Sequence, residues 1–118
     1  VADNASVSIT ANHSDTVGNN ANQASTTVLK DTVNPTVAIS SSPVINNGNK
    51  AAYTVSGTCS EDTRNVVVTV GGVSSTVSCS TTSWSATLNV TAVADSAAVA
   101  VSATHSDSAG NTATPATC

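Results

Sequence analysis

Seven acidic side chains are the groups in this 118-residue sequence best suited to bind a cation. Each falls in a predicted turn or linker rather than inside a predicted strand: Asp3, Asp15, Asp31, Glu61, Asp62, Asp95 and Asp107. Calcium takes about six to eight oxygen ligands in flexible geometry, so a few loop acids can form a weak site where extracellular calcium is abundant. No EF-hand spacing is present, and Asp also suits turns without any metal, so solvated loop acids are the alternative.

Two His-Ser-Asp triplets, at 13–15 and 105–107, contain the residue types of a hydrolase triad. Consecutive strand residues point to alternate faces, whereas a catalytic relay needs three side chains that converge. The triplets therefore indicate strand ends. Because the chain has only three basic residues, seven acids and two histidines, it offers few groups for acid–base chemistry, and we expect no enzyme.

Two further features could take part in binding or modification. Trp84 could stack on a sugar if it were exposed, but its alternation with Leu88 predicts a core residue. Three Asn-x-Ser/Thr sequons are candidate N-glycosylation sites, at Asn4, Asn12 and Asn89. A sequence so rich in Asn, Ser and Thr also produces sequons by chance.

The composition favours an all-β fold. Five residue types (Ser, Thr, Val, Ala and Asn) supply 86 of the 118 positions, and aromatic residues make up only 2%. This mixture is too apolar for a disordered chain and poor in strong helix formers. With a net charge of −4 we expect neither nucleic-acid binding nor adsorption to an anionic membrane, and no apolar run is long enough for membrane insertion.

The two ends of the chain repeat each other. Residues 1–26 align with residues 93–118 without a gap at a constant offset of 92, and 13 of the 26 positions are identical. We therefore expect a tandem repeat of about 92 residues. Residues 1–30 would be the C-terminal hairpin of a preceding repeat, and residues 31–118 a nearly complete copy.

Alternation of apolar and polar residues predicts the strands of that copy. Six are expected at 36–41, 50–59, 65–70, 73–79, 83–90 and 97–105, with a seventh after Asn111. Gly71-Gly72 is a two-residue hairpin signal. Ala51, Tyr53 and Val55 are expected to face inward in the second strand. About seven short strands indicate a two-sheet β-sandwich.

Strand direction places the cysteines and several acids at the ends of this sandwich. The second and fourth strands run the same way, so Cys59 and Cys79 reach the same pole and are predicted to form a disulfide; two reduced core cysteines are the alternative. Cys118 has no predicted partner. Where two copies meet, five acids would converge on a candidate calcium site: Asp3, Asp31, Glu61, Asp62 and Asp107.

Several motifs resemble the bacterial immunoglobulin-like repeats of large surface adhesins and biofilm-associated proteins. They are Asp-Thr-Val-Asn-Pro-Thr-Val-Ala-Ile at 31–39, Val-Ser-Gly-Thr-Cys-Ser-Glu at 55–61, Trp-Ser at 84–85, Val-Ala-Asp at 93–95 and His-Ser-Asp-Ser-Ala-Gly-Asn-Thr at 105–112. The resemblance covers the whole chain and implies an immunoglobulin-like fold at the cell surface. In several relatives calcium stiffens the junctions, for which Asp31 and Asp107 match the motif, with Asp15 equivalent to Asp107.

The expected function is a structural spacer that extends and stiffens the stalk of an extracellular bacterial adhesin or filament. Its partners would be neighbouring repeats of the same chain, or identical chains in a fibre. One alternative is a filament subunit assembled by strand exchange between chains. Another is a carbohydrate-binding module. Calcium is the one cofactor that the sequence suggests.

Overall fold

The computed structural model describes all 118 residues and divides them into two compact units, Val1–Val33 (unit 1) and Asn34–Cys118 (unit 2). Both units are built from strands and connecting loops. None of the chain is a helix long and apolar enough to cross a membrane. The interpretation of residues 1–30 as the end of a preceding repeat stays a prediction.

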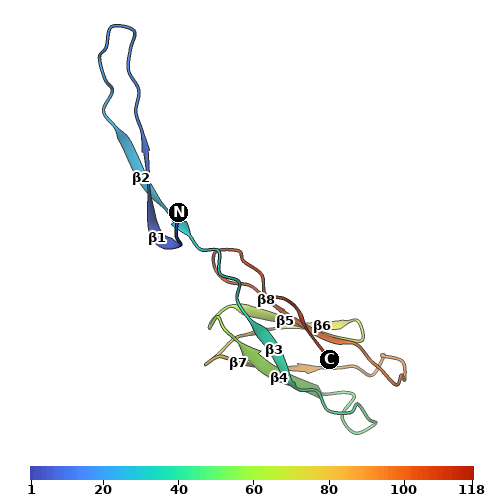
Figure 1. Ribbon diagram of the computed structural model, residues 1–118. Coiled ribbons are helices and arrows are strands. Elements are labelled where there is room, and N and C mark those ends of the chain that lie inside the picture. The colour runs from blue at the N-terminus through green and yellow to red at the C-terminus, as the bar shows by residue number, and fades with distance from the viewer. The chain divides into compact units, whose positions relative to one another are not determined.

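Unit 1 is a long antiparallel hairpin of β1 (Asn4–Ala11) and β2 (Ala24–Lys30), shown in blue in Figure 1. The two strands pair from Val7↔Val28 to Ala11↔Ala24, with an irregularity between Asn4 and Val7. No second layer covers either face within this unit, so Ile9 is 48% exposed. A two-stranded hairpin without a packed face is at best marginally stable alone.

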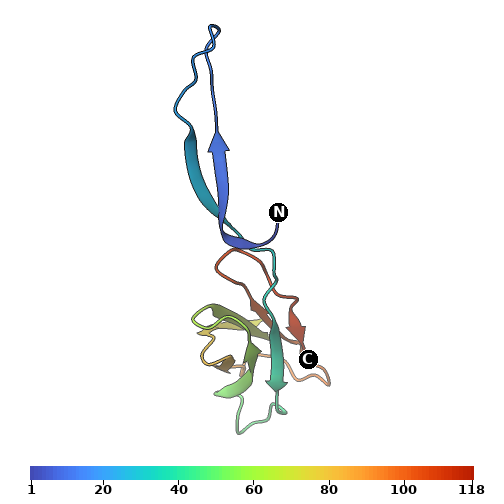
Figure 2. The same ribbon diagram turned by 60° about the vertical axis from the view of Figure 1, so that its left-hand side comes forward.

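Unit 2 is a sandwich of two antiparallel sheets (Figures 1 and 2). The first sheet has the order β3-β4-β7, from β3 (Val37–Ser41), β4 (Tyr53–Cys59) and β7 (Ser83–Leu88). The second has the order β6-β5-β8-β9, from β5 (Asn65–Val70), β6 (Val73–Ser78), β8 (Val101–His105) and β9 (Ala116–Thr117). The seven strands confirm the predicted all-β, immunoglobulin-like sandwich.

Two predicted strands begin three or four residues later than expected, and the strand predicted at 83–90 ends at Leu88. The second strand begins at Tyr53, because Asn46 O accepts the N–H groups of Asn49 (3.2 Å) and Lys50 (3.0 Å) and holds this segment in turns. Ala51 lies in that segment and is exposed, so the prediction that it faces inward is wrong.

The sixth strand begins at Val101 rather than at residue 97. In the β5–β8 ladder Val101 is the last residue paired with β5, and β9 pairs only with Ser102 and Ala103. Beyond Val101, the Ala100 carbonyl still accepts the Gly71 N–H (2.9 Å), but residues 97–100 pair with neither β5 nor β9 as a strand. Periodicity detects the alternation in this segment but not the missing neighbours.

The core lies between the two sheets and is made mostly of small and β-branched side chains on alternate strand positions: Tyr53, Val55, Cys59, Val66, Val68, Val70, Cys79, Trp84, Ala86, Leu88, Val90, Val101 and Ala103. Trp84 is 3% exposed, and its indole N–H donates to the carbonyls of Ala38 (3.2 Å) and Thr58 (3.1 Å). Its predicted core position is confirmed.

Gly57 pairs with Trp84 across β4 and β7. A Cβ at this position would lie 1.8 Å from the Ala38 carbonyl oxygen and 2.8 Å from Cζ2 of Trp84. The close approach of β3 and of the indole ring therefore requires glycine here.

Candidate functional site

The Asp107 loop follows β8 directly and closes on its own carboxylate. Oδ1 accepts the Asn111 backbone N–H (2.8 Å), and Oδ2 accepts the Asn111 side-chain amide (2.9 Å). Gly110 takes a φ of 96°, which suits glycine in this turn. These hydrogen bonds, that of the Asn111 side chain first, lower the pKa of Asp107. Asp107 is only 4% exposed, so the loop is part of the packed sandwich.

The Asp15 loop of unit 1 has the same hydrogen bonds. Oδ1 of Asp15 accepts the Asn19 backbone N–H (2.9 Å), and Oδ2 accepts the Asn19 side-chain amide (2.8 Å). The Asn19 side chain is again the main reason that the pKa of Asp15 is lowered. Gly18 takes a φ of 91°, close to that of Gly110. Unlike Asp107, Asp15 is exposed.

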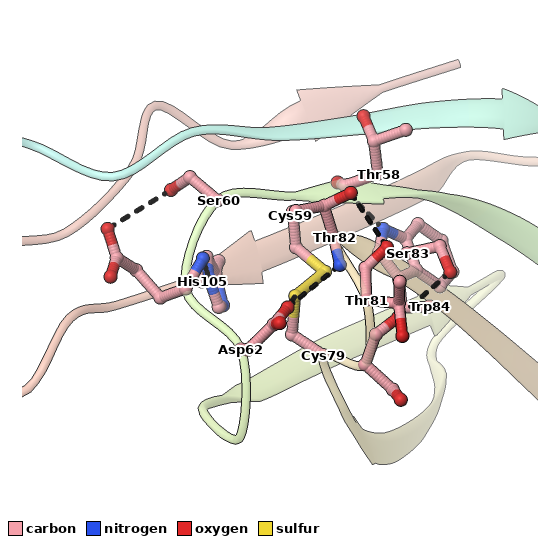
Figure 3. The surroundings of a disulfide bond; sticks show 12 residues. Thr58, Cys59, Ser60, Asp62, Cys79, Thr81, Thr82, Ser83, Trp84 and His105 are labelled. Carbon is pink, nitrogen blue, oxygen red and sulfur yellow. Dashed lines mark hydrogen bonds between the residues drawn. A yellow bond between two sulfur atoms is a disulfide. The ribbon is translucent and has the colours of Figure 1, made fainter.

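Asp62 lies in the β4–β5 loop and stabilises the turn between β6 and β7. Its Oδ1 accepts the Thr82 backbone N–H (2.8 Å). Thr81 and Thr82 have φ values of 51° and 60°, a left-handed conformation that β-branched residues rarely adopt. Figure 3 shows Asp62 beside this turn and beside the disulfide. Asp62 thus acts as a local acceptor that holds a strained two-residue hairpin.

Glu61 precedes Asp62 and reaches His105 through its backbone. The Glu61 N–H donates to Nε2 of His105 (3.2 Å), while Nδ1 of His105 donates to the Asn65 carbonyl (2.9 Å). His105 is 3% exposed and therefore joins β8 to the β4–β5 loop from inside the protein. This role was not predicted, although His105 continues the inward alternation of Val101 and Ala103.

Asp3 and Asp31 both accept hydrogen bonds from the residues that follow β2. Asp3 accepts the Thr32 backbone N–H (2.9 Å, Oδ2) and the Thr32 hydroxyl (2.9 Å, Oδ1). The Thr32 backbone contact is the main reason that the pKa of Asp3 is lowered. Oδ1 of Asp31 accepts the Val33 N–H (3.0 Å). Both acids therefore order the linker within unit 1.

The residues present do not form a metal site within either unit. Nowhere in the chain do three or more His, Cys, Asp or Glu side chains gather in a way that would hold a metal ion. Asp15, Asp31 and Asp107 accept N–H groups of their own loops. Asp3 and Asp62 accept those of segments 29 and 20 residues away in sequence. The predicted convergence of Asp3, Asp31, Glu61, Asp62 and Asp107 on calcium concerns the junction of two copies, and it stays a prediction.

A disulfide joins Cys59 at the end of β4 to Cys79 after β6, with a Cα–Cα distance of 6.1 Å (Figure 3). This is the pair that strand direction predicted. Both residues are buried, and the bond links the first sheet to the second. A closed loop of this length stabilises the folded state by about 3 kcal/mol in the chain-entropy model. Cys118 is exposed and free, and its Sγ lies 2.9 Å from the Ser42 hydroxyl.

The remaining candidate residues have local roles. Trp84 is buried, so it does not provide the exposed platform that a carbohydrate-binding module would need. The sequon residues Asn4, Asn12 and Asn89 are exposed. Asn4 and Asn89 each accept a backbone N–H two residues ahead, while Asn12 accepts the Gln23 amide. Their glycosylation stays a prediction.

An open cleft of about 500 Å³ lies at the end of unit 2 opposite the Asp107 loop. Its apolar surface comes from Ile45, Val90, Val93 and Val99, and its charged groups are Lys50 and Asp95. Neither charged side chain has a hydrogen bond or an ion pair within the chain. Asp95 lies in a predicted loop, but no pattern in the sequence indicates the cleft beside it.

Solved chains of bacterial adhesins are similar to this chain. One, from a Ca²⁺-stabilised adhesin that helps an Antarctic bacterium reach out and bind ice, is 27% identical with a TM-score of 0.54, and the match covers 96% of this chain. Another, from a 1.5-MDa bacterial ice-binding adhesin retained at the host cell surface, is 23% identical with a TM-score of 0.51 over 97% of this chain. The matches span only 30% and 39% of those chains.

A bacterial immunoglobulin-like domain of the M. primoryensis ice-binding adhesin is 27% identical, with a TM-score of 0.49; the match covers 73% of this chain and 92% of that domain. No protein-family description matches the chain, and no curated protein does. The predicted resemblance to the repeats of large bacterial adhesins is confirmed by the similarity to the 27% identical chain with a TM-score of 0.54.

Proposed function

We propose that this chain is a structural spacer from an extracellular bacterial adhesin, in which immunoglobulin-like sandwiches follow one another at a step of 92 residues. The observation that carries the proposal is the pair of turns at Asp15 and Asp107, which lie 92 positions apart and have the same side-chain and backbone hydrogen bonds. The similarity to a Ca²⁺-stabilised adhesin chain supports the class of protein.

Burial supports the same proposal. In unit 2, Val101 and His105 face the core and are 6% and 3% exposed. Their equivalents at the offset of 92 are Ile9, which is 48% exposed, and His13, which is also exposed. In the proposed array, strands of a preceding copy equivalent to β5 and β7 cover this face of the unit 1 hairpin.

The function we propose is mechanical and not catalytic. Val37 at the start of β3 pairs with Cys59, whereas Cys118 pairs through backbone hydrogen bonds with Val101 at the start of β8. His105, at the C-terminal end of β8, contacts Glu61, which closely follows Cys59. The C-terminal end of β8 therefore lies at the same end of the sandwich as Val37, and Val101 with Cys118 lies at the opposite end. The chain thus enters and leaves unit 2 at opposite ends. A pulling force would therefore act along the antiparallel ladders and the disulfide.

The test is small-angle X-ray scattering on this chain extended by one and by two further copies of residues 27–118, which continue the repeat in register. The expected result is a rod whose maximum dimension grows by a constant length with each copy. A particle that stays compact would contradict the proposal. Measurement with calcium and then with excess chelator shows whether an ion at the junction adds stiffness.

Assembly by strand exchange is the second candidate, because the exposed face of unit 1 could also be covered by another chain. Sedimentation velocity over a wide concentration range separates the two. The spacer proposal expects a monomer. Concentration-dependent oligomers that disappear when residues 1–33 are removed would favour the filament subunit instead.

A further inference from the structure

A side-chain contact within unit 1 holds the segment that follows β2. The Asp3 carboxylate, in the segment just before β1, accepts both the backbone N–H and the hydroxyl of Thr32, two residues after β2. Both Thr32 donors lie within 3.0 Å of Asp3 Oδ2, and the hydroxyl is also 2.9 Å from Oδ1. A carboxylate that binds two donors of one residue restrains its position more than a single bond does.

Lys30 and Asp31 complete this contact. The Lys30 ammonium lies 4.0 Å from Oδ1 of Asp3 and also donates to the Val1 carbonyl. Asp31 accepts the N–H of Val33 and so shapes the next turn of the linker. The Lys-Asp-Thr sequence at 30–32 thus lies against the Val-Ala-Asp sequence at 1–3.

Unit 2 carries the same Val-Ala-Asp sequence at 93–95, at the offset of 92. Here the Asp95 carboxylate has no partner and lies on the rim of the cleft of about 500 Å³ described above. The cleft also presents one positive charge, from Lys50. A Lys-Asp-Thr segment carries one charge of each sign, so its charges are complementary to those of the cleft.

The backbone beside Asp95 is also open. In unit 1, β2 pairs with β1 as far as Asn4↔Lys30. In unit 2, β9 pairs only with Ser102 and Ala103, and the Cys118 backbone adds two hydrogen bonds to Val101. The equivalent edge at 96–100 therefore has no strand partner from β9. Unpaired edges of this kind accept an extended segment by strand addition.

We propose that Asp95 and its cleft form a docking site for an extended Lys-Asp-Thr segment, which continues the line of β9 and gives its Thr N–H and hydroxyl to Asp95 as Thr32 does to Asp3. The inference rests on the proposed function, because in a tandem array the occupant is the linker to the next sandwich. Each loop carboxylate then fixes the direction in which a linker leaves its sandwich, independently of calcium.

The first experiment measures amide hydrogen exchange in the 118-residue chain without added residues, in wild type and in two variants. Asp3→Ala should speed exchange of the Thr32 amide at least about tenfold, because that N–H loses a charged acceptor. Asp31→Ala is the matched control and should leave the Thr32 amide protected while freeing that of Val33. Chelator should change neither rate. Protection of Thr32 that depends on calcium would overturn the metal-independent contact.

The second experiment uses the chain extended after Cys118 by the ten residues of 27–36. The appended Thr equivalent to Thr32 should show a protected amide, and Asp95→Ala should remove that protection. Glu61→Ala, at the other end of unit 2, is the control and should not. An unprotected appended Thr, or one insensitive to Asp95→Ala, would refute the docking site. Failure of the proposed function would instead appear as a compact particle in the scattering experiment, whichever way the exchange rates fall.

Discussion

The β1–β2 hairpin of unit 1 and the β8–β9 hairpin of unit 2 have nearly the same turn in different surroundings. Asp15 and Asp107 each bind the backbone and side chain of an Asn four residues ahead, and a Gly precedes that Asn with a φ of 91° or 96°. Yet Asp15 is exposed and Asp107 is 4% exposed. The turn is therefore determined locally, and its burial is determined by the strands around it.

The histidines show the same difference. His13 and His105 stand at equivalent places before the two turns, and both are followed by Ser-Asp. Only the His105 ring is buried and hydrogen-bonded, to the Asn65 carbonyl and the Glu61 N–H, because only unit 2 contains the β4–β5 loop. A residue type repeated in sequence thus acquires a structural role from its neighbours. The following predictions test this contrast between a packed and an unpacked copy.

Removal of the disulfide should have the largest effect and should act on unit 2 alone. Replacing both Cys59 and Cys79 by Ala should cost about 3 kcal/mol and lower Tm by roughly 15 °C, because the unfolded chain regains the freedom of the closed loop. Thermal unfolding followed by circular dichroism measures the change. Cys118→Ser is the control and should leave Tm unchanged. An unaltered Tm in the double variant would show that packing alone holds the two sheets together.

Truncation of equivalent apolar side chains should distinguish the two hairpins directly. Val101→Ala should destabilise unit 2 by about 2 kcal/mol, because it removes two buried methyl groups and leaves a cavity. Ile9→Ala, at the matched position of unit 1, should change stability by less than about 0.5 kcal/mol, because Ile9 is 48% exposed. Urea unfolding of the two variants provides the comparison. Equal losses would mean that unit 1 is packed in solution.

The paired turns should respond differently to pH. Asp107→Ala should lower Tm by about 5 °C at pH 7, while Asp15→Ala should lower it by about 1 °C, because only the Asp107 loop packs in the sandwich. The folded-state pKa of Asp107 lies below 3.8, so the ionised carboxylate stabilises unit 2 above that pH. Its contribution is lost as the pH falls through the folded pKa. The Tm difference between wild type and Asp107→Ala should therefore shrink as the pH is lowered from 7 to below 3.8; a constant difference would contradict this.

Relief of strain in the β6–β7 turn should give the smallest effect, and a stabilising one. Every non-glycine residue with positive φ belongs to unit 2: Thr63, Thr81 and Thr82. Replacing Thr81 by Asn and Thr82 by Gly should raise stability by about 1 kcal/mol, because both residues adopt the left-handed conformation of this turn more easily. Thr76→Gly, on an exposed strand position, is the control and should destabilise. A loss of stability in the double variant would show that the Thr side chains have another role.

Much of the fold was predictable because it depends on local alternation. The strands at 65–70 and 73–78 follow the apolar period and the Gly71-Gly72 signal, and the φ values of these glycines, 55° and 89°, suit a tight hairpin. The disulfide followed from strand direction. Ala51 was predicted wrongly because the hydrogen bonds of Asn46 override a short alternating pattern.

The roles of the acids were not predictable in the same way. Asp62 and Thr82 are 20 residues apart in sequence, and their contact depends on how two loops meet at one end of the sandwich. Asp3 and Thr32 are 29 residues apart and meet only because β1 and β2 pair in one register. The number of carboxylates and their loop positions can be read from the sequence, but the partners of Asp3 and Asp62 depend on how the strands pair.

The sequence by itself predicted the all-β class, the offset of 92 residues between equivalent positions and the two Asp–Asn turns, because these depend on residue type, spacing and contacts within a few positions. The cysteine pair, 20 residues apart, also required the predicted strand directions. Only the tertiary structure decided which copy of each repeated residue is buried, which N–H groups each acid accepts, and that Asp95 lies on an open cleft. Those properties arise where chain segments far apart in sequence meet, and hydrogen bonds and burial there depend on the neighbours that the fold supplies.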